Sequence, residues 1–142
     1  MQPGAAIPPS AFELRIPVRN EDVDQLGHVN NVVYLRWVQE IAIAHWRVLA
    51  SVEERAKLLW VVQRHEIDYK RPALPDDVVI ARTWVGEAHR RAFERHTAFL
   101  RESDGRLLAQ ALTLWCPVDA ATLRPTEVDA AIRARFSIPR PA

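Results

Sequence analysis

A change of hydrophobic period near residue 57 limits most strongly what this chain can fold into. From residue 32 to about residue 50, apolar side chains recur on nearly every side of a helical wheel, the pattern of a helix buried almost all round. After residue 57, apolar residues recur with a strand-like period, and turn residues appear at short spacing. The chain therefore combines one long buried helix with a run of strands.

Turn signals divide the second part of the chain into four segments. Strands are predicted at residues 58–69, 78–85, 93–101 and 107–115. A short alternating segment at 12–18 precedes the long helix, and a cap at Thr126 predicts a last helix that runs to about residue 136. We predict an α+β fold with one domain at 12–136, in which a curved antiparallel sheet wraps around the central helix, and flexible ends at 1–11 and 137–142.

The composition argues against several classes of function. With 19 Lys+Arg and 18 Asp+Glu the net charge is +1, which gives no general attraction to nucleic acid or to a membrane surface. The single cysteine, Cys116, excludes an intramolecular disulfide and a cysteine-built zinc site, which favours a reducing compartment. No signal-peptide pattern and no apolar run of membrane-spanning length occur, so we expect a cytoplasmic protein.

An acidic segment directly ahead of the long helix is the candidate active site. Between Glu21 and Asn31 it contains three carboxylates, a glycine, a histidine and two asparagines. The N-terminus of a helix carries unpaired N–H groups and the positive end of the helix dipole, so it can polarise a carbonyl oxygen. A carboxylate just upstream can attack that carbonyl or activate water. The alternative is an acidic turn capped by Asn30 or Asn31.

The motif at residues 22–31, followed by Tyr34 and Trp37, resembles the hotdog-fold acyl-CoA thioesterases of the 4-hydroxybenzoyl-CoA thioesterase type. The likeness extends over about residues 12–136. It implies hydrolysis of an acyl-CoA or acyl-carrier-protein thioester to a free acid and a thiol. Coenzyme A then enters as part of the substrate, and no metal or other cofactor is expected. The acyl group remains open.

Roles for individual residues follow from this resemblance. Asp24 matches the family's catalytic carboxylate, which acts as nucleophile or general base, and the backbone N–H of Asn31 lies where the thioester carbonyl is polarised. Gly27, Asn30 and Tyr34 belong to the same motif and are expected to contact the substrate.

His28 has two possible roles in the same motif. It either lines the site or forms a structural hydrogen bond, because Leu26 stands where the plant acyl-carrier-protein thioesterases have an asparagine.

A basic turn between two predicted strands is the candidate phosphate site. His89, Arg90 and Arg91 occupy the position where the resembled family places a basic run against the nucleotide phosphates of coenzyme A. The guanidinium group suits this role because it binds phosphate in a two-pronged fashion. The alternative is a solvated hairpin turn.

Other candidate chemistry is weaker. Some hotdog thioesterases use a helix glutamate in place of the loop aspartate, but Glu40 shares a helical stripe with Arg36 and Arg47, which favours ion pairing. The five histidines have no short paired spacing, so a metal site is not expected. The chain also lacks the Gly-x-Ser-x-Gly motif of serine hydrolases.

Two rival functions and the assembly stay open. Hotdog hydratases and dehydratases typically have five residues from aspartate to histidine, whereas Asp24 and His28 are four apart. A non-catalytic acyl-binding hotdog module is the second rival. We expect a homodimer or homotetramer, because one curved sheet over one helix leaves an edge strand and a face uncovered.

Overall fold

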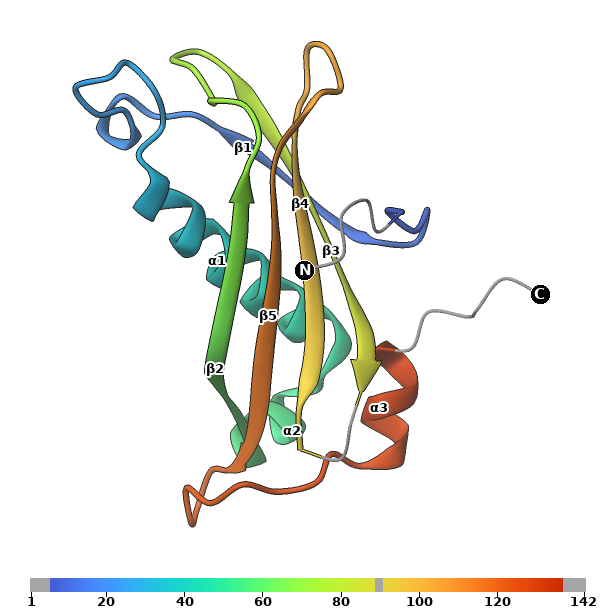
Figure 1. Cartoon of the computed structure of the whole chain (residues 1–142). Helices are drawn as coiled ribbons and strands as arrows, with labels where there is room; N and C mark the ends of the chain where they lie inside the picture. Colours follow the sequence, from blue (N-terminus) through green and yellow to red (C-terminus); the bar gives the residue numbers. More distant parts are fainter. Residues whose placement is uncertain (1–5, 89–90, 137–142) are drawn as a thin grey trace.

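The computed structural model describes residues 6–88 and 91–136, which form a sheet with helices packed against it (Figure 1). The elements are β1 (Phe12–Pro17), η1 (Asn20–Asp22), α1 (Asn31–Leu49), α2 (Val52–Lys57), β2 (Leu58–Tyr69), β3 (Val78–Ala88), β4 (Phe93–Arg101), β5 (Leu107–Asp119) and α3 (Ala130–Phe136). Within the described residues, five antiparallel strands are ordered β1-β3-β4-β5-β2, and α1 runs along one face. The predicted α+β fold, a curved sheet around one long helix, is confirmed.

The core lies between α1 and the sheet because α1 presents one face of large apolar residues. Tyr34, Trp37, Val38 and Ile41 are buried on this face. The ring of Trp37 is 1% exposed, and its centroid lies 5.9 Å from that of Phe99 on β4. Truncating a buried ring of this size costs about 3–5 kcal/mol, so this contact anchors α1 to the sheet.

Three parts of the sequence prediction need correction. The first is α2, which was not predicted although its signal is local. The Ser51 hydroxyl accepts a hydrogen bond from the Glu54 N–H at 3.1 Å, and the Glu54 carboxylate accepts one from the Ser51 N–H at 2.9 Å. This reciprocal pair is a capping box, which the spacing of serine and glutamate could have indicated.

The second correction concerns Thr126, which is not a helix cap, since α3 begins only at Ala130. The Thr126 N–H donates to the carbonyl oxygen of Pro117 at 3.0 Å, and Pro125 forms a bridge with Val118. These contacts hold residues 125–126 extended beside β5, so the helix starts later.

The third correction concerns α1, which is not buried all round. Val32, Ile43 and Val48 are 68%, 46% and 71% exposed. The sheet covers only one face of α1, and no other described element lies over these residues. An apolar surface of this kind on one chain favours contact with another surface.

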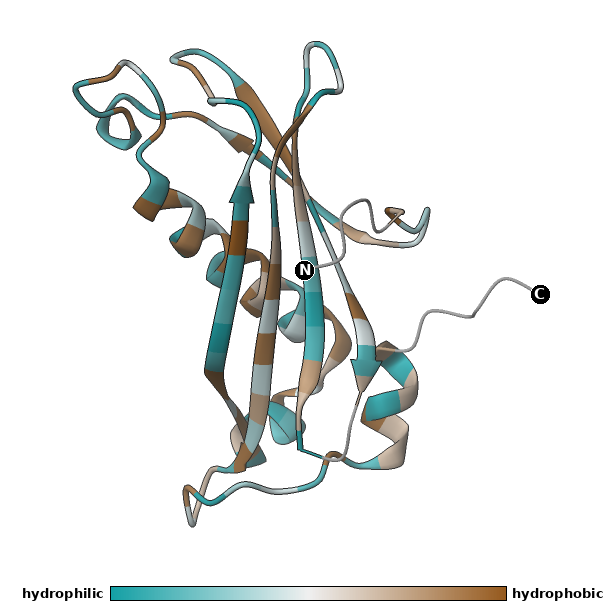
Figure 2. Ribbon diagram, in the orientation of Figure 1, coloured by the Kyte–Doolittle hydropathy of each residue, from teal (hydrophilic) through white to brown (hydrophobic). Residues whose placement is uncertain are grey.

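The strand β2 is an edge of the sheet and carries a second exposed apolar surface. Apolar and polar residues alternate along the strands (Figure 2), so one side of β2 faces the core. Its neighbour in the described sheet is β5, and its side chains Leu59 and Val61 are 43% and 50% exposed. In the described part of the chain, no helix is both long and apolar enough to cross a membrane.

Candidate active site

The acidic loop, residues 21–30, folds into a tight turn that delivers the chain to α1. Val23 pairs with Val29 across the loop, and the Asp24 N–H donates to the His28 carbonyl oxygen at 3.0 Å. The Gly27 N–H donates to the Asp24 carbonyl oxygen at 3.0 Å, and Gly27 has a φ of +74°. A side chain is rarely accommodated at this angle, so the turn favours glycine.

Asp22 is the buried carboxylate that fastens the loop to α1. It is 1% exposed, and its Oδ1 accepts from the Arg36 guanidinium at 2.8 Å while its Oδ2 accepts from the Arg19 N–H at 3.1 Å. Burial acts to raise the pKa of this carboxyl, but the hydrogen bonds from Arg36 and from the Arg19 N–H outweigh burial and hold the pKa below its usual value. The Asp22 carbonyl oxygen also accepts from the Asn30 N–H at 2.9 Å. Asp22 therefore has a structural role that the sequence analysis did not assign.

Asp24 lies two residues further along and is only half-buried. Its Oδ1 accepts a hydrogen bond from the Leu26 N–H at 2.9 Å, which orients the carboxylate within the turn. No ion pair joins Asp24 to another residue of the described chain. This carboxylate is thus held in place without a neutralising partner, which leaves it able to accept a proton or to attack a carbonyl carbon.

The N-terminus of α1 supplies a free donor where the acidic loop ends. Asn30 is the N-cap: its Oδ1 accepts from the Val32 N–H and its carbonyl oxygen from the Val33 N–H, both at 2.9 Å. The Asn31 N–H has no acceptor among the described residues, and the Asn31 carbonyl oxygen accepts from the Tyr69 hydroxyl at 3.1 Å. One N–H at the positive end of the helix dipole therefore stays available to an oxyanion.

The remaining motif residues differ in their access to this junction. Tyr34 is 2% exposed, with its ring edge-on to Trp37 and Tyr69, and burial raises its pKa. It lies in the core beneath the junction. His28 is half-buried, and Gly27 is exposed at the turn. Substrate contacts by Gly27, Asn30 and Tyr34, and a catalytic role for His28, stay predictions.

Arg91, the described residue of the basic turn, does not lie near the acidic loop in one chain. Arg91 is exposed and follows the end of β3, while His89 and Arg90 lie outside the described residues. Pro17, which leads to the acidic loop, pairs with Val78 at the start of β3. The 11 residues of β3 span roughly 30 Å, so the two regions lie at opposite ends of the sheet (Figure 1).

A family model for the thioesterase-like superfamily matches residues 18–136. The chain belongs to this superfamily. The match includes the acidic loop, α1 and the basic turn, which are the regions on which the resemblance to hotdog thioesterases was based. That resemblance is confirmed.

Three relatives have low sequence identity to this chain, but the similarity extends over nearly the full length of both chains. The long-chain acyl-CoA thioesterase FadM of Escherichia coli K12 is 23% identical over 130 residues, which cover 88% of this chain and 96% of FadM. A thioesterase from Thermus thermophilus, solved with coenzyme A and Zn, is 29% identical with a TM-score of 0.77, covering 87% of this chain and 90% of that one. The 1,4-dihydroxy-2-naphthoyl-CoA thioesterase Slr0204 from Synechocystis is 16% identical with a TM-score of 0.77, covering 89% and 96%. This last likeness shows the shared fold.

Glu40, the alternative to Asp24 as the catalytic carboxylate, lies on the exposed side of α1. It forms an ion pair with Arg36 at 3.3 Å, and Arg36 also binds Asp22. The predicted ion pairing of Glu40 is confirmed. Among the described residues, no group of three or more histidine, cysteine, aspartate or glutamate side chains is arranged to hold a metal ion.

Proposed function

We propose that this protein hydrolyses an acyl-CoA thioester, with the chemistry at the junction of the acidic loop and α1. The proposal rests on two groups that lie close in sequence: the oriented Asp24 carboxylate in the acidic loop and the unpaired Asn31 N–H at the start of α1. Family membership and the acyl-CoA thioesterase FadM among the relatives support the same substrate class.

The two groups have complementary roles in this reaction. The thioester carbonyl oxygen would accept from the Asn31 N–H, so that negative charge develops at the positive end of the α1 dipole. Asp24 would either take a proton from an attacking water or attack the carbonyl carbon itself. In the first route the C–O bond to water forms and the C–S bond breaks. In the second route the Asp24 carboxylate displaces the thiolate, which takes a proton and leaves as the free thiol, so that the C–S bond breaks as an acyl-aspartate anhydride forms. Water then hydrolyses the anhydride to the free acid and the Asp24 carboxylate.

The test is release of free thiol from a panel of CoA thioesters with short, long and aromatic acyl groups. We expect turnover of at least one member, with a rate proportional to enzyme concentration. Binding of these thioesters without any thiol release would instead support an acyl-binding module. Hydration of an enoyl-CoA at a rate above thiol release would support the hydratase alternative.

We further propose that the working form is a homodimer or a homotetramer. The acidic loop and Arg91 lie at opposite ends of β3, a strand that spans roughly 30 Å, which supports sites built from two chains. The exposed apolar residues of α1 and of edge strand β2 supply surface for such an assembly. Light scattering at micromolar concentration should give a multiple of the 16.2 kDa chain mass. A monomer under these conditions would contradict this proposal.

The basic turn is proposed to bind the phosphates of coenzyme A. Replacing both Arg90 and Arg91 with alanine should raise KM for CoA thioesters about tenfold or more, because charge-assisted contacts contribute about 1.5–3 kcal/mol each, while kcat stays nearly unchanged. Arg106, an exposed arginine in the turn between β4 and β5, gives the matched control Arg106→Ala. The double variant should also hydrolyse a short pantetheine thioester as the wild type does. An unchanged KM for the CoA thioester would leave the turn a solvated hairpin.

A further inference from the structure

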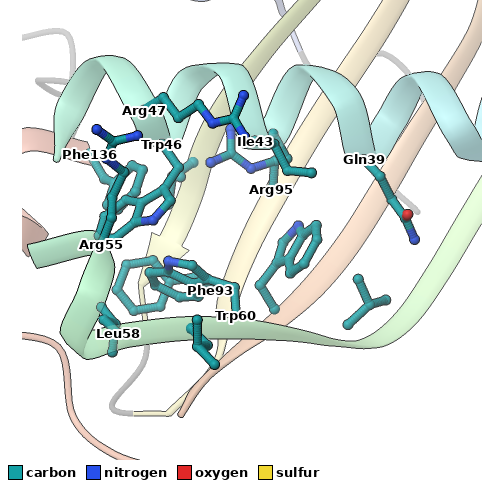
Figure 3. Close-up of a pocket in the computed structure, with 15 residues that line it drawn as sticks. Gln39, Ile43, Trp46, Arg47, Arg55, Leu58, Trp60, Phe93, Arg95 and Phe136 are labelled. Atoms are coloured by element: carbon teal, nitrogen blue, oxygen red, sulfur yellow. The ribbon is translucent and has the colours of Figure 1, made fainter. Parts of the chain in front are cut away.

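A second candidate site lies at the end of the sheet away from the acidic loop. A cavity of about 610 Å³ opens between the C-terminal half of α1 and the inner face of the sheet (Figure 3). Cavities of about 300–1,000 Å³ commonly hold small organic ligands. Of the residues that the structure describes, five aromatic side chains and three arginines line this cavity, and no carboxylate does. The surface of the cavity is therefore both apolar and positively charged.

Arg95 on β4 is the buried cation of this cavity. It is 5% exposed, and its Nη1 lies 2.9 Å from His45 Nδ1 and 3.1 Å from Thr83 Oγ1. Burial, followed by the Arg95 charge, lowers the pKa of His45 to about 4, so the histidine is neutral at pH 7. Burial also lowers the pKa of Arg95 to about 10, which leaves the guanidinium charged.

The Arg95 charge has no counter-ion in the part of the chain that the structure describes. Its neutral partners His45 and Thr83 provide acceptor atoms, and the ring of Phe136 lies 5.8 Å from the guanidinium carbon. A buried charge without an opposite charge lowers the stability of a fold. A cavity wall that retains such a charge is complementary to an anion from outside the chain.

The rest of the cavity is suited to the apolar body of that anion. Trp46 stacks on Phe136 with ring centroids 5.8 Å apart, and Trp60 lies edge-on to Phe93 at 4.9 Å. The indole Nε1 atoms of Trp60 and Trp115 are buried and have no hydrogen-bond partner among the residues that the structure describes. The walls thus provide flat aromatic surface for the body of the ligand, and the buried Arg95 provides the charge.

We propose that this cavity binds a free apolar carboxylic acid, with the carboxylate on Arg95 and the hydrocarbon or ring body against the aromatic walls. The acidic loop disfavours such an anion, because Asp24 is an unneutralised carboxylate there. A carboxylic acid is also the chemical class of product that thioester hydrolysis releases. The inference does not depend on that reaction, since binding of a free acid requires no turnover.

The test is a binding titration with acids and their uncharged amides. The probes are 2-naphthoate, 4-phenylbutyrate and laurate, each compared with the corresponding amide, followed by calorimetry and by tryptophan fluorescence. Three tryptophans line the cavity, so an occupant should change their emission. We expect at least one acid to bind tenfold or more tightly than its amide. If no acid binds more tightly than its amide, the proposal is overturned.

Variants locate the binding site. Arg95→Met keeps an unbranched side chain but shortens it and removes the charge, and it should reduce the affinity for the acid to that of the amide. Arg95→Lys keeps a positive charge and should retain part of the affinity for the acid. Arg106→Met, which changes an exposed arginine outside the cavity, should bind the acid as the wild type does. Wild-type affinity in a folded Arg95→Met variant would overturn the proposal.

A rim variant keeps the test decisive if Arg95 variants do not fold. Arg47 lines the cavity and is exposed, so Arg47→Glu reverses a charge at the rim without removing a core side chain or an apolar residue of the proposed subunit contact. It should weaken acid binding tenfold or more and change amide binding by less than threefold. Equal losses for acid and amide, or no loss for the acid, would contradict a charge-selective site.

Discussion

Asp24→Asn is expected to lower kcat by about 10²–10⁴ while leaving the fold intact. The amide keeps the shape of the side chain and can still accept the hydrogen bond from the Leu26 N–H, so the turn should survive. It cannot take a proton from water, and it is a poor nucleophile. Steady-state thiol release with a good acyl-CoA substrate measures the loss, and circular dichroism with thermal unfolding checks the fold.

Isotope labelling then separates the two possible roles of Asp24. In single-turnover hydrolysis in ¹⁸O-water, label in the Asp24 carboxylate identifies a nucleophile, because water has then attacked the aspartyl carbon of an acyl-aspartate anhydride. A general base leaves label only in the released acid, as does a nucleophile whose anhydride is attacked at the acyl carbon, and trapping of the acyl-enzyme distinguishes these two cases. Glu40→Gln is the matched control, because Glu40 is an exposed carboxylate on α1 that pairs with Arg36. A folded Asp24→Asn enzyme with near-wild-type turnover would remove Asp24 from the mechanism and direct attention to Glu40.

The sequence predicted those features of the fold that depend on local pattern. The bounds of β2 and β4 match the predicted segments at residues 58–69 and 93–101, because each segment is bounded by turn signals. The helix α1 was placed within one residue at each end. The exposed side of α1 was not predicted, because a helical pattern that is apolar all round does not reveal whether a covering surface belongs to the same chain.

The candidate site was only partly predictable for the same physical reason. The acidic loop and the helix N-terminus are neighbours in sequence, so their contact follows from local spacing. The partner of Asp22 is Arg36, 14 residues away, and nothing in the spacing distinguishes Asp22 from Asp24. The cavity with Arg95 combines residues from α1 to α3, and its unpaired charge becomes visible only when those elements are packed together.

Asp22→Asn is expected to show the opposite result from Asp24→Asn, with a loss of stability and little loss of turnover. The two oxygens of Asp22 face two donors, the Arg36 guanidinium and the Arg19 N–H. An asparagine must turn its own NH₂ group toward one of these donors in either orientation. Loss of a charge-assisted bond and a buried donor without an acceptor should together lower the free energy of unfolding by about 2–4 kcal/mol.

The pH dependence of the stability lost in Asp22→Asn shows whether the carboxylate charge causes that loss. The pKa of the Asp22 carboxyl is lower in the folded protein than in the unfolded chain. The stabilisation by this carboxylate is therefore complete above the unfolded pKa of about 4, and it is lost as the pH falls from there through the folded pKa. Urea unfolding of wild type and Asp22→Asn should therefore give a constant difference from pH 7 to pH 5 and a smaller difference at pH 3. A difference that stays the same at pH 3 would mean that packing, rather than the carboxylate charge, holds the acidic loop on α1.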